Sequence, residues 1–139
     1  MLDQYILSFW AFLFIVFTLL LQTLIATGAH RKQTQYVPGV VSENLGHESF
    51  VFRSHRTFQN SLENAPMMLF AAVLAVLVGL SPGQLAATLW TFAIARLIHM
   101  ALYYAISTEK NPSPRSYFYA IAMLSNLVLV VMIAAHLAS

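Results

Sequence analysis

The sequence has no cysteine in its 139 residues. This absence excludes disulfide bonds, thiolate metal sites and a cysteine nucleophile, so any thiol chemistry needs a thiol that a substrate supplies. It leaves the redox compartment open. Charged residues are also scarce, at 9%, whereas an ordinary soluble domain contains about 25%. Together with 59% apolar residues, this composition indicates a membrane protein.

The few charges do not form the clusters that several function classes need. Seven lysines and arginines and five acidic residues give a formal net charge of +2, and no dense basic run occurs, so we expect no nucleic-acid partner. The five histidines include no HExxH pair and no cluster with ligand spacing, so we expect no metal site. Ser116 lacks a G-x-S-x-G setting, which argues against a serine hydrolase.

Four long apolar runs account for most of the chain. Each is about as long as a helix must be to cross roughly 30 Å of hydrocarbon. The expected spans are about residues 5–26, 50–80, 84–106 and 115–137. The first run has no basic start and is too long for a cleaved signal peptide, so we expect it to remain in the protein. The sequence thus predicts an all-α, integral membrane four-helix bundle that forms one domain over residues 1–139.

Proline and glycine mark the connections between these spans. Residues 33–48 are rich in turn-forming residues and lack apolar periodicity, which predicts the longest loop. The triplet 81–83, Ser-Pro-Gly, predicts a tight turn after the second span. Pro66 is expected to kink the second span, because it frees the carbonyl group of Leu62.

Positive charge gathers at one set of span ends. The cationic residues of the first and third loops and their borders are Arg31, Lys32, Arg53, Arg56, Lys110 and Arg115. The two termini and the second connection carry none. Because short loops rich in lysine and arginine stay in the cytoplasm, we expect both termini outside and a polar site that faces the cytoplasm. In a bacterium this would be the inner membrane.

Polar residues interrupt the second and third spans at helical spacing. On the second span Arg56, Asn60 and Glu63 follow an i, i+4, i+7 pattern, which places them on one helix face. The third span repeats the pattern with Arg96, His99 and Tyr103. An ionisable group at the bilayer centre costs roughly 2.5–3.5 kcal/mol, so these faces should turn toward a bundle interior or a wet cavity.

Two interpretations of these polar faces remain open. In the first, they line a pocket for a small anionic ligand, where arginines bind carboxylates, Glu63 binds an ammonium group and Asn60 binds an amide. In the second, Arg56, Glu63 and Arg96 form interhelical ion pairs that set the helix register.

Three motifs occur in order on the last three spans. They are Arg56-x-x-x-Asn60-x-x-Glu63-x-x-Pro66, Arg96-x-x-His99-x-x-x-Tyr103 and Pro114-Arg115-Ser116-x-x-Tyr119. This combination resembles the membrane-associated proteins in eicosanoid and glutathione metabolism (MAPEG), a family with microsomal glutathione transferases, leukotriene C4 synthase and microsomal prostaglandin E synthase. The resemblance covers all four spans. It implies a homotrimer that binds glutathione between neighbouring subunits at the cytoplasmic side.

The resemblance also implies roles for individual residues. The residues that would hold the carboxylates, amides and amine of glutathione are Arg56, Asn60, Glu63, His99 and Tyr103. Tyr119 would pack on glutathione or bond to it. Arg115 would stabilise the thiolate, and Ser116 matches a serine proposed to assist in the prostaglandin synthase. We also expect Gln59 and Arg96 to bind glutathione, with Arg96 as our next candidate for the thiolate role.

The chain departs from the family pattern at two positions. Gln59 stands where the prostaglandin synthase has an arginine, and Met123 stands where it has a glutamine. Fewer polar contacts therefore remain for glutathione or a related thiol. Arg31 is a further candidate for ligand binding from the first span.

The expected function is a membrane-bound glutathione transferase or peroxidase-type enzyme for detoxification. Glutathione would be its cosubstrate, and a hydrophobic small molecule or lipid electrophile would reach it from the bilayer. One alternative is a non-catalytic glutathione- or lipid-binding membrane protein of the same fold, which thiolate formation would distinguish. Another is a small four-helix exporter in which Glu63 couples protons to transport, which uptake into vesicles would distinguish.

Overall fold

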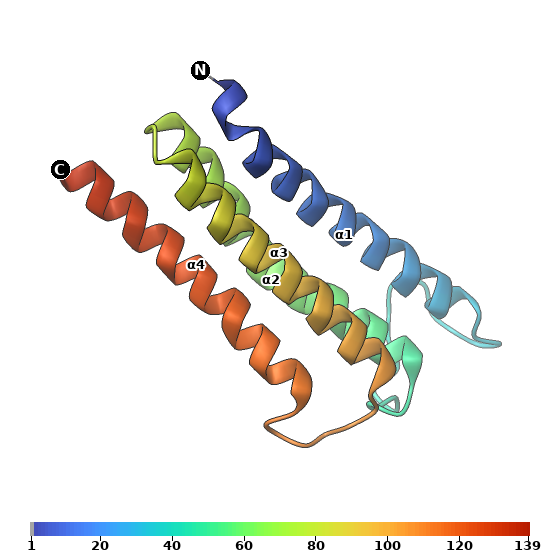
Figure 1. The fold of residues 1–139 in the computed structure, drawn as a ribbon. Helices are drawn as coiled ribbons and strands as arrows, with labels where there is room; N and C mark the ends of the chain where they lie inside the picture. The colour runs from blue at the N-terminus through green and yellow to red at the C-terminus, as the bar shows by residue number, and fades with distance from the viewer. Residues whose placement is uncertain (1) are drawn as a thin grey trace.

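The computed structural model describes residues 2–139 as a bundle of four long helices. A short 3₁₀ turn (Leu2–Tyr5) leads into α1 (Ile6–Arg31), which is followed by α2 (Phe50–Leu77), α3 (Pro82–Ala105) and α4 (Pro114–Ala138). All four helices are long and apolar enough to cross a membrane (Figure 1). The prediction of an all-α, four-helix membrane protein is confirmed.

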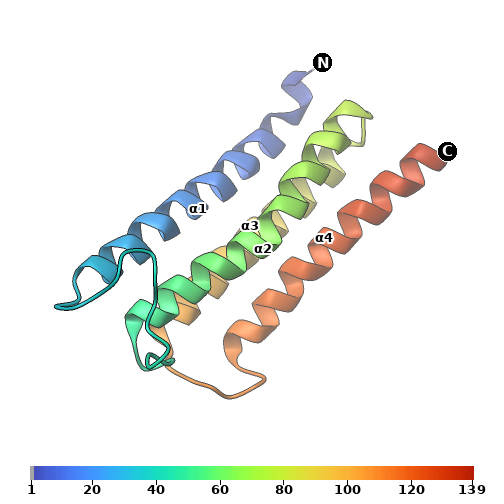
Figure 2. The same cartoon turned by 180° about the vertical axis from the view of Figure 1, so that it is seen from behind.

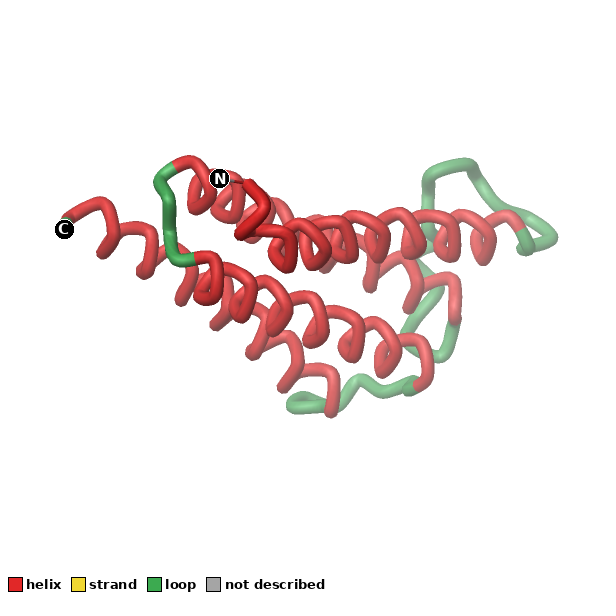
Figure 3. Tube along the Cα trace, turned by 45° about the horizontal axis from the view of Figure 1, so that its top comes forward, coloured by secondary structure: helices red, strands yellow, loops and turns green. Residues whose placement is uncertain are grey.

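The helices α2 and α3 lie between α1 and α4 (Figures 1 and 2). Contacts join α3 to α4, α1 to both α2 and α3, and α2 to α3 and α4. The two chain ends lie at the same end of the bundle as the short α2–α3 connection (Figure 3). The long connections, residues 32–49 and 106–113, lie together at the other end, which we call the loop end.

The first helix extends further than the apolar run that predicts it. It ends at Arg31, beyond the expected boundary at residue 26, and its last turn carries His30 and Arg31. Cationic side chains are favoured there because the carbonyl groups at a helix C-terminus carry partial negative charge. Helical backbone therefore continues past the residues that suit hydrocarbon.

The turn between α2 and α3 lies earlier than predicted. After Leu77 the chain reverses at Gly79, whose φ of 77° is in the left-handed region that glycine adopts readily. Two backbone bonds close the helix end, from Leu80 N–H to the Ala75 carbonyl and from Gly79 N–H to the Val76 carbonyl. The prediction that 81–83 forms this turn is wrong, because Pro82 suits the first position of a helix and already belongs to α3.

The second helix continues through its internal proline. Pro66 lies inside α2, which is one uninterrupted helix from Phe50 to Leu77. Pro66 therefore does not break α2 into two helices.

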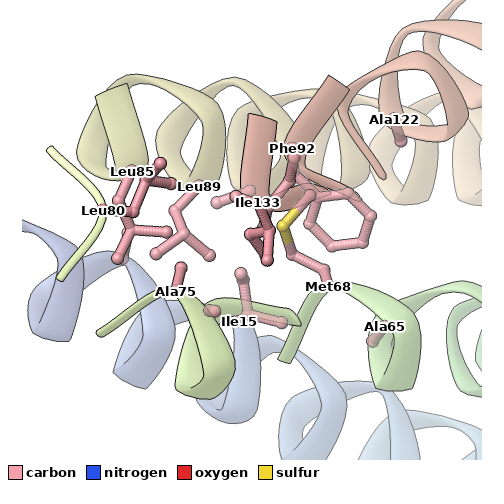
Figure 4. Packing of buried hydrophobic residues seen from close by; sticks show 14 of the residues in the cluster. Ile15, Ala65, Met68, Ala75, Leu80, Leu85, Leu89, Phe92, Ala122 and Ile133 are labelled. Atoms are coloured by element: carbon pink, nitrogen blue, oxygen red, sulfur yellow. The ribbon is translucent and has the colours of Figure 1, made fainter. Parts of the chain in front are cut away.

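An apolar core runs along the interior of the bundle. Phe92 of α3 and Met68 of α2 are fully buried against each other, with Ile133 of α4 nearby (Figure 4). Small residues let the helices approach closely. The buried alanines at these contacts include Ala11, Ala65, Ala72, Ala75 and Ala122. Many large apolar side chains face outward instead, as expected where the surrounding solvent is lipid.

Truncating the core should therefore cost far more than truncating the outer surface. We expect Phe92→Ala to destabilise the protein by about 3–5 kcal/mol, because Phe92 is 0% exposed and the change leaves a cavity. The matched control is Phe70→Ala on α2, where the side chain is 78% exposed. Thermal unfolding in detergent measures both. Equal effects of the two changes would contradict this description of the core.

Candidate functional site

Several predicted site residues meet at the loop end around the ring of Tyr103. The Arg115 guanidinium carbon lies 4.1 Å from the centre of this ring. The ring of His99 lies 5.6 Å from Tyr103 and 6.4 Å from Tyr119, measured between centroids. Two of the motifs, on α3 and α4, thus combine into one cluster of aromatic and cationic side chains.

Arg115 lies in the first turn of α4, and only one of its two Nη atoms has a hydrogen-bond partner among the described residues. Its Nη2 donates to the Thr108 carbonyl at 2.8 Å, which ties α4 to the preceding loop. Its Nη1 is buried and has no hydrogen-bond partner within residues 2–139. The guanidinium, stacked on an aromatic ring, therefore keeps one buried N–H donor that no described residue uses.

Ser116 takes part in the start of the same helix. Its Oγ accepts a hydrogen bond from the backbone N–H of Ser113 at 3.1 Å and lies 3.2 Å from the Ser113 hydroxyl. This pairing satisfies a backbone donor at the N-terminus of α4. The side chain remains half-buried, beside Arg115 in sequence.

Arg96 lies deeper in the bundle, where it links α3 to α2. Its side chain is 4% exposed, and it donates from Nη1 to Asn60 Oδ1 and from Nη2 to Ser61 Oγ, both at 2.8 Å. Both acceptors are neutral, so the contact differs from the interhelical ion pair that was one interpretation of the sequence. A buried arginine in this place orients the amide of Asn60.

Two further amide hydrogen bonds extend the polar contacts of α2 toward α4. The Asn126 amide donates to the Asn64 carbonyl oxygen at 3.3 Å, and the Asn64 amide donates to the Asn60 carbonyl oxygen at 2.7 Å. Hydrogen bonds between helices are the expected partners for polar groups that lie in hydrocarbon. On α2 the side chains of Asn60 and Ser61 thus hold Arg96 of α3, and the backbone carbonyl of Asn64 holds Asn126 of α4.

The three polar residues of the α2 face have different surroundings. Arg56 donates from Nη1 to Gln59 Oε1 at 3.1 Å, within the same helix. Asn60 is half-buried against Arg96, whereas Glu63 is exposed. The spacing correctly predicts a shared side of the helix, but the single chain does not cover the carboxylate.

A separate hollow of about 550 Å³ lies between α1, α2 and the first loop. Arg31 and Gln59 line it, together with His30 and His55. The walls are otherwise a mixture of small, aromatic and aliphatic side chains. The structure therefore places two of the predicted residues, Arg31 and Gln59, at this hollow, whereas His99, Tyr119 and Arg115 gather around Tyr103. Arg96 and Asn60 belong to neither group and meet between α2 and α3.

His47 belongs to the Tyr103 cluster although sequence reasoning did not select it. Its ring stacks on Tyr103 with centroids 5.8 Å apart, and its carbonyl oxygen accepts from Arg53 Nη1 and the Ser107 hydroxyl. It lies in the loop, where no periodicity reveals which way a side chain faces. Its only signal was a histidine just before a helix that carries polar residues.

The surroundings of His47 disfavour its charged form. Burial first, and the Arg115 guanidinium second, hold the pKa of His47 below its usual value of 6.5. Arg53 lowers this pKa further, whereas Glu109 and Glu48 oppose the shift. A neutral imidazole therefore lies beside Arg115 at neutral pH.

This lowered pKa predicts a pH-dependent stability. The folded state favours neutral His47, so its contribution is fully present above pH 6.5 and is lost as the pH falls through the lower folded pKa. We expect the melting temperature to fall less between pH 7.5 and pH 5 in His47→Phe, which keeps an aromatic ring on Tyr103. His136→Phe, at the opposite end of the bundle, is the control. An unchanged slope in His47→Phe would contradict the prediction.

A protein-family model covers nearly the whole chain. The MAPEG family model matches residues 7–135 of the 139-residue chain, which includes all three motifs and most of each helix. No curated protein and no solved structure matches the chain. Membership in this family fits a multi-pass membrane protein with a function related to glutathione. The chain belongs to the MAPEG family.

Proposed function

We propose that this protein is a membrane-bound glutathione transferase or peroxidase-type enzyme. The observation that carries the proposal is the placement of Arg115 at the N-terminus of α4, stacked on Tyr103 with a buried donor that has no partner within residues 2–139. A cation at a helix N-terminus favours a bound anion. The family membership supports glutathione as the source of that anion.

The chemical role of Arg115 is to favour the thiolate of bound glutathione. A free cysteine thiol has a pKa of about 8.5, and nearby cations lower it by one or more units. A drop of about two units corresponds to roughly 2.7 kcal/mol in favour of the thiolate. The thiolate sulfur then attacks an electrophilic carbon to form a C–S bond as the leaving group departs. With a lipid peroxide it attacks the terminal peroxide oxygen instead, so that the O–O bond breaks and the alkoxide leaves as the lipid alcohol. The resulting glutathione sulfenic acid then reacts with a second glutathione to give glutathione disulfide and water.

The residues that bind the tripeptide come from two surfaces of the chain. Arg31 and Gln59 line the hollow between α1 and α2, whereas His99, Tyr103 and Arg115 belong to the Tyr103 cluster. Glu63 is exposed at the depth of the apolar spans, where a lone carboxylate is costly. A homotrimer in which one subunit covers these groups on the next would join the two surfaces and shield Glu63.

The site would face the cytoplasm, where the water-soluble cosubstrate is available. Six of the seven lysines and arginines lie at the loop end or its borders, and only Arg96 lies elsewhere. This distribution supports an orientation with the loop end inside. A hydrophobic electrophile would reach the same site from the bilayer.

Removing the Arg115 guanidinium tests the thiolate role. We expect Arg115→Ala to bind glutathione, yet to leave its thiol pKa close to that of free glutathione and to conjugate an aryl halide much more slowly. Ultraviolet absorbance of the thiolate, titrated with pH, measures the change. Lys110→Ala, which removes a loop cation exposed to solvent, is the control. Normal thiolate formation in Arg115→Ala would move the role to another cation.

Mixing two inactive variants tests the shared site. Arg31→Ala and Arg115→Ala should each lose conjugation, because each lacks one of the two surfaces. Mixed trimers from co-expression should regain part of the activity, since some interfaces then pair two intact surfaces. Co-expression of two copies of the same variant is the control. No recovery in mixed trimers would count against a site between subunits, and purely monomeric protein in native mass spectrometry would exclude it.

A further inference from the structure

A glutamine in the middle of α1 has no obvious reason to be buried. Gln22 is 1% exposed, and neither its Oε1 nor its Nε2 has a hydrogen-bond partner within residues 2–139. Burying an amide in an apolar environment without hydrogen bonds costs at least about 1–3 kcal/mol. In a membrane-spanning helix, lipid supplies no replacement partner. The side chain therefore needs a polar partner inside the bundle.

Gln22 lines a small cavity where three helices meet. The cavity has a volume of about 10 Å³, and its polar lining comes from Thr18 and Gln22 of α1, Ser61 of α2 and Arg96 of α3. This volume is close to the minimum for one water molecule and too small for any larger ligand. Its other walls are apolar.

Besides the Gln22 amide, Arg96 and Ser61 each have one hydrogen-bond donor near this cavity without a partner among the described residues. Arg96 commits both Nη atoms to Asn60 and Ser61, but its buried Nε has no partner in the described chain. The Ser61 Oγ accepts from Arg96, so its own hydroxyl hydrogen can donate elsewhere. The cavity thus combines an amide acceptor with two donors.

We propose that one buried water molecule occupies this cavity and joins α1 to the arginine of α3. The water accepts hydrogen bonds from Arg96 Nε–H and the Ser61 hydroxyl, and it donates to Gln22 Oε1. Three hydrogen bonds are the usual number for a buried water. The site fixes the plane of the guanidinium, which holds Asn60 in its orientation. Gln22 is therefore a positioning residue for Asn60, and only this last step rests on the proposed function.

A double-mutant cycle tests the water site without glutathione. Gln22→Leu and Ser61→Ala should each lower the melting temperature in detergent, and the double variant should lose less than the sum, because either change alone removes the bridge. Thr23→Val is the control, since Thr23 bonds only to its own helix at the Leu19 carbonyl. Additive losses would overturn the proposal. If Gln22→Leu does not fold, Gln22→Met with Ser61→Ala provides the same cycle.

A structure at a resolution that shows ordered water gives a second, direct test. Density for one water between Gln22, Ser61 and Arg96 is expected. A direct bond between Gln22 and Arg96 with no water density would overturn the water site.

Binding of glutathione tests the positioning role separately. Gln22→Leu should raise the dissociation constant about tenfold, while the thiol pKa of bound glutathione stays low because Arg115 is unchanged. An unchanged dissociation constant would overturn the positioning role. Absence of binding to the unmodified protein, with the water and the coupling present, would instead refute the proposed function alone.

Discussion

The buried guanidinium of Arg96 is the constraint on which the rest of the structure depends. A cation inside a membrane-spanning bundle is costly unless hydrogen bonds satisfy it. Asn60 and Ser61 on α2 supply those bonds, so α2 and α3 must face each other at this depth. One turn further along α2, the backbone carbonyl oxygen of Asn64 accepts a hydrogen bond from the side-chain amide of Asn126 on α4. These hydrogen bonds set the relative positions of three helices and leave Asn60 half-buried.

The loop end builds its site on the side of the bundle that α3 and α4 share. Tyr103 provides an aromatic surface that Arg115, His99 and His47 approach from three different segments. The carbonyl oxygen of His47 is held by Arg53 and Ser107, which fixes the end of the long first loop against the beginning of the next one. Arg115 is therefore held in position by a helix and an aromatic ring rather than carried on a loop without contacts. Such preorganisation is what electrostatic stabilisation of a developing anion requires.

The exposed surfaces of the single chain explain why an assembly is part of the proposed function. Much of the apolar exterior can face lipid, but the carboxylate of Glu63 and the side chains of Arg31 and Gln59 at the hollow are polar groups that lipid does not satisfy. They lie on α1 and α2, away from Arg115. A second copy of the chain that brings its Tyr103 cluster to this surface would satisfy both. The same argument accounts for the long first loop, which forms one wall of the hollow.

The sequence alone determined the number and type of elements, because four apolar runs of membrane-spanning length leave the backbone no alternative to helices. Its motifs also identified the family, and their spacing placed His99 and Tyr103 on one helix face. The tertiary structure decided what periodicity cannot express. The α2–α3 turn lies at Gly79 rather than at residues 81–83, because the backbone hydrogen bonds that close α2 form at its last turn and not where the apolar run ends. His47 joined the cluster because loop positions follow from packing, and Glu63 became exposed because a helix face says nothing about which neighbour covers it. No sequence pattern singles out Gln22, and only the folded structure shows that it is buried at the same cavity as Arg96.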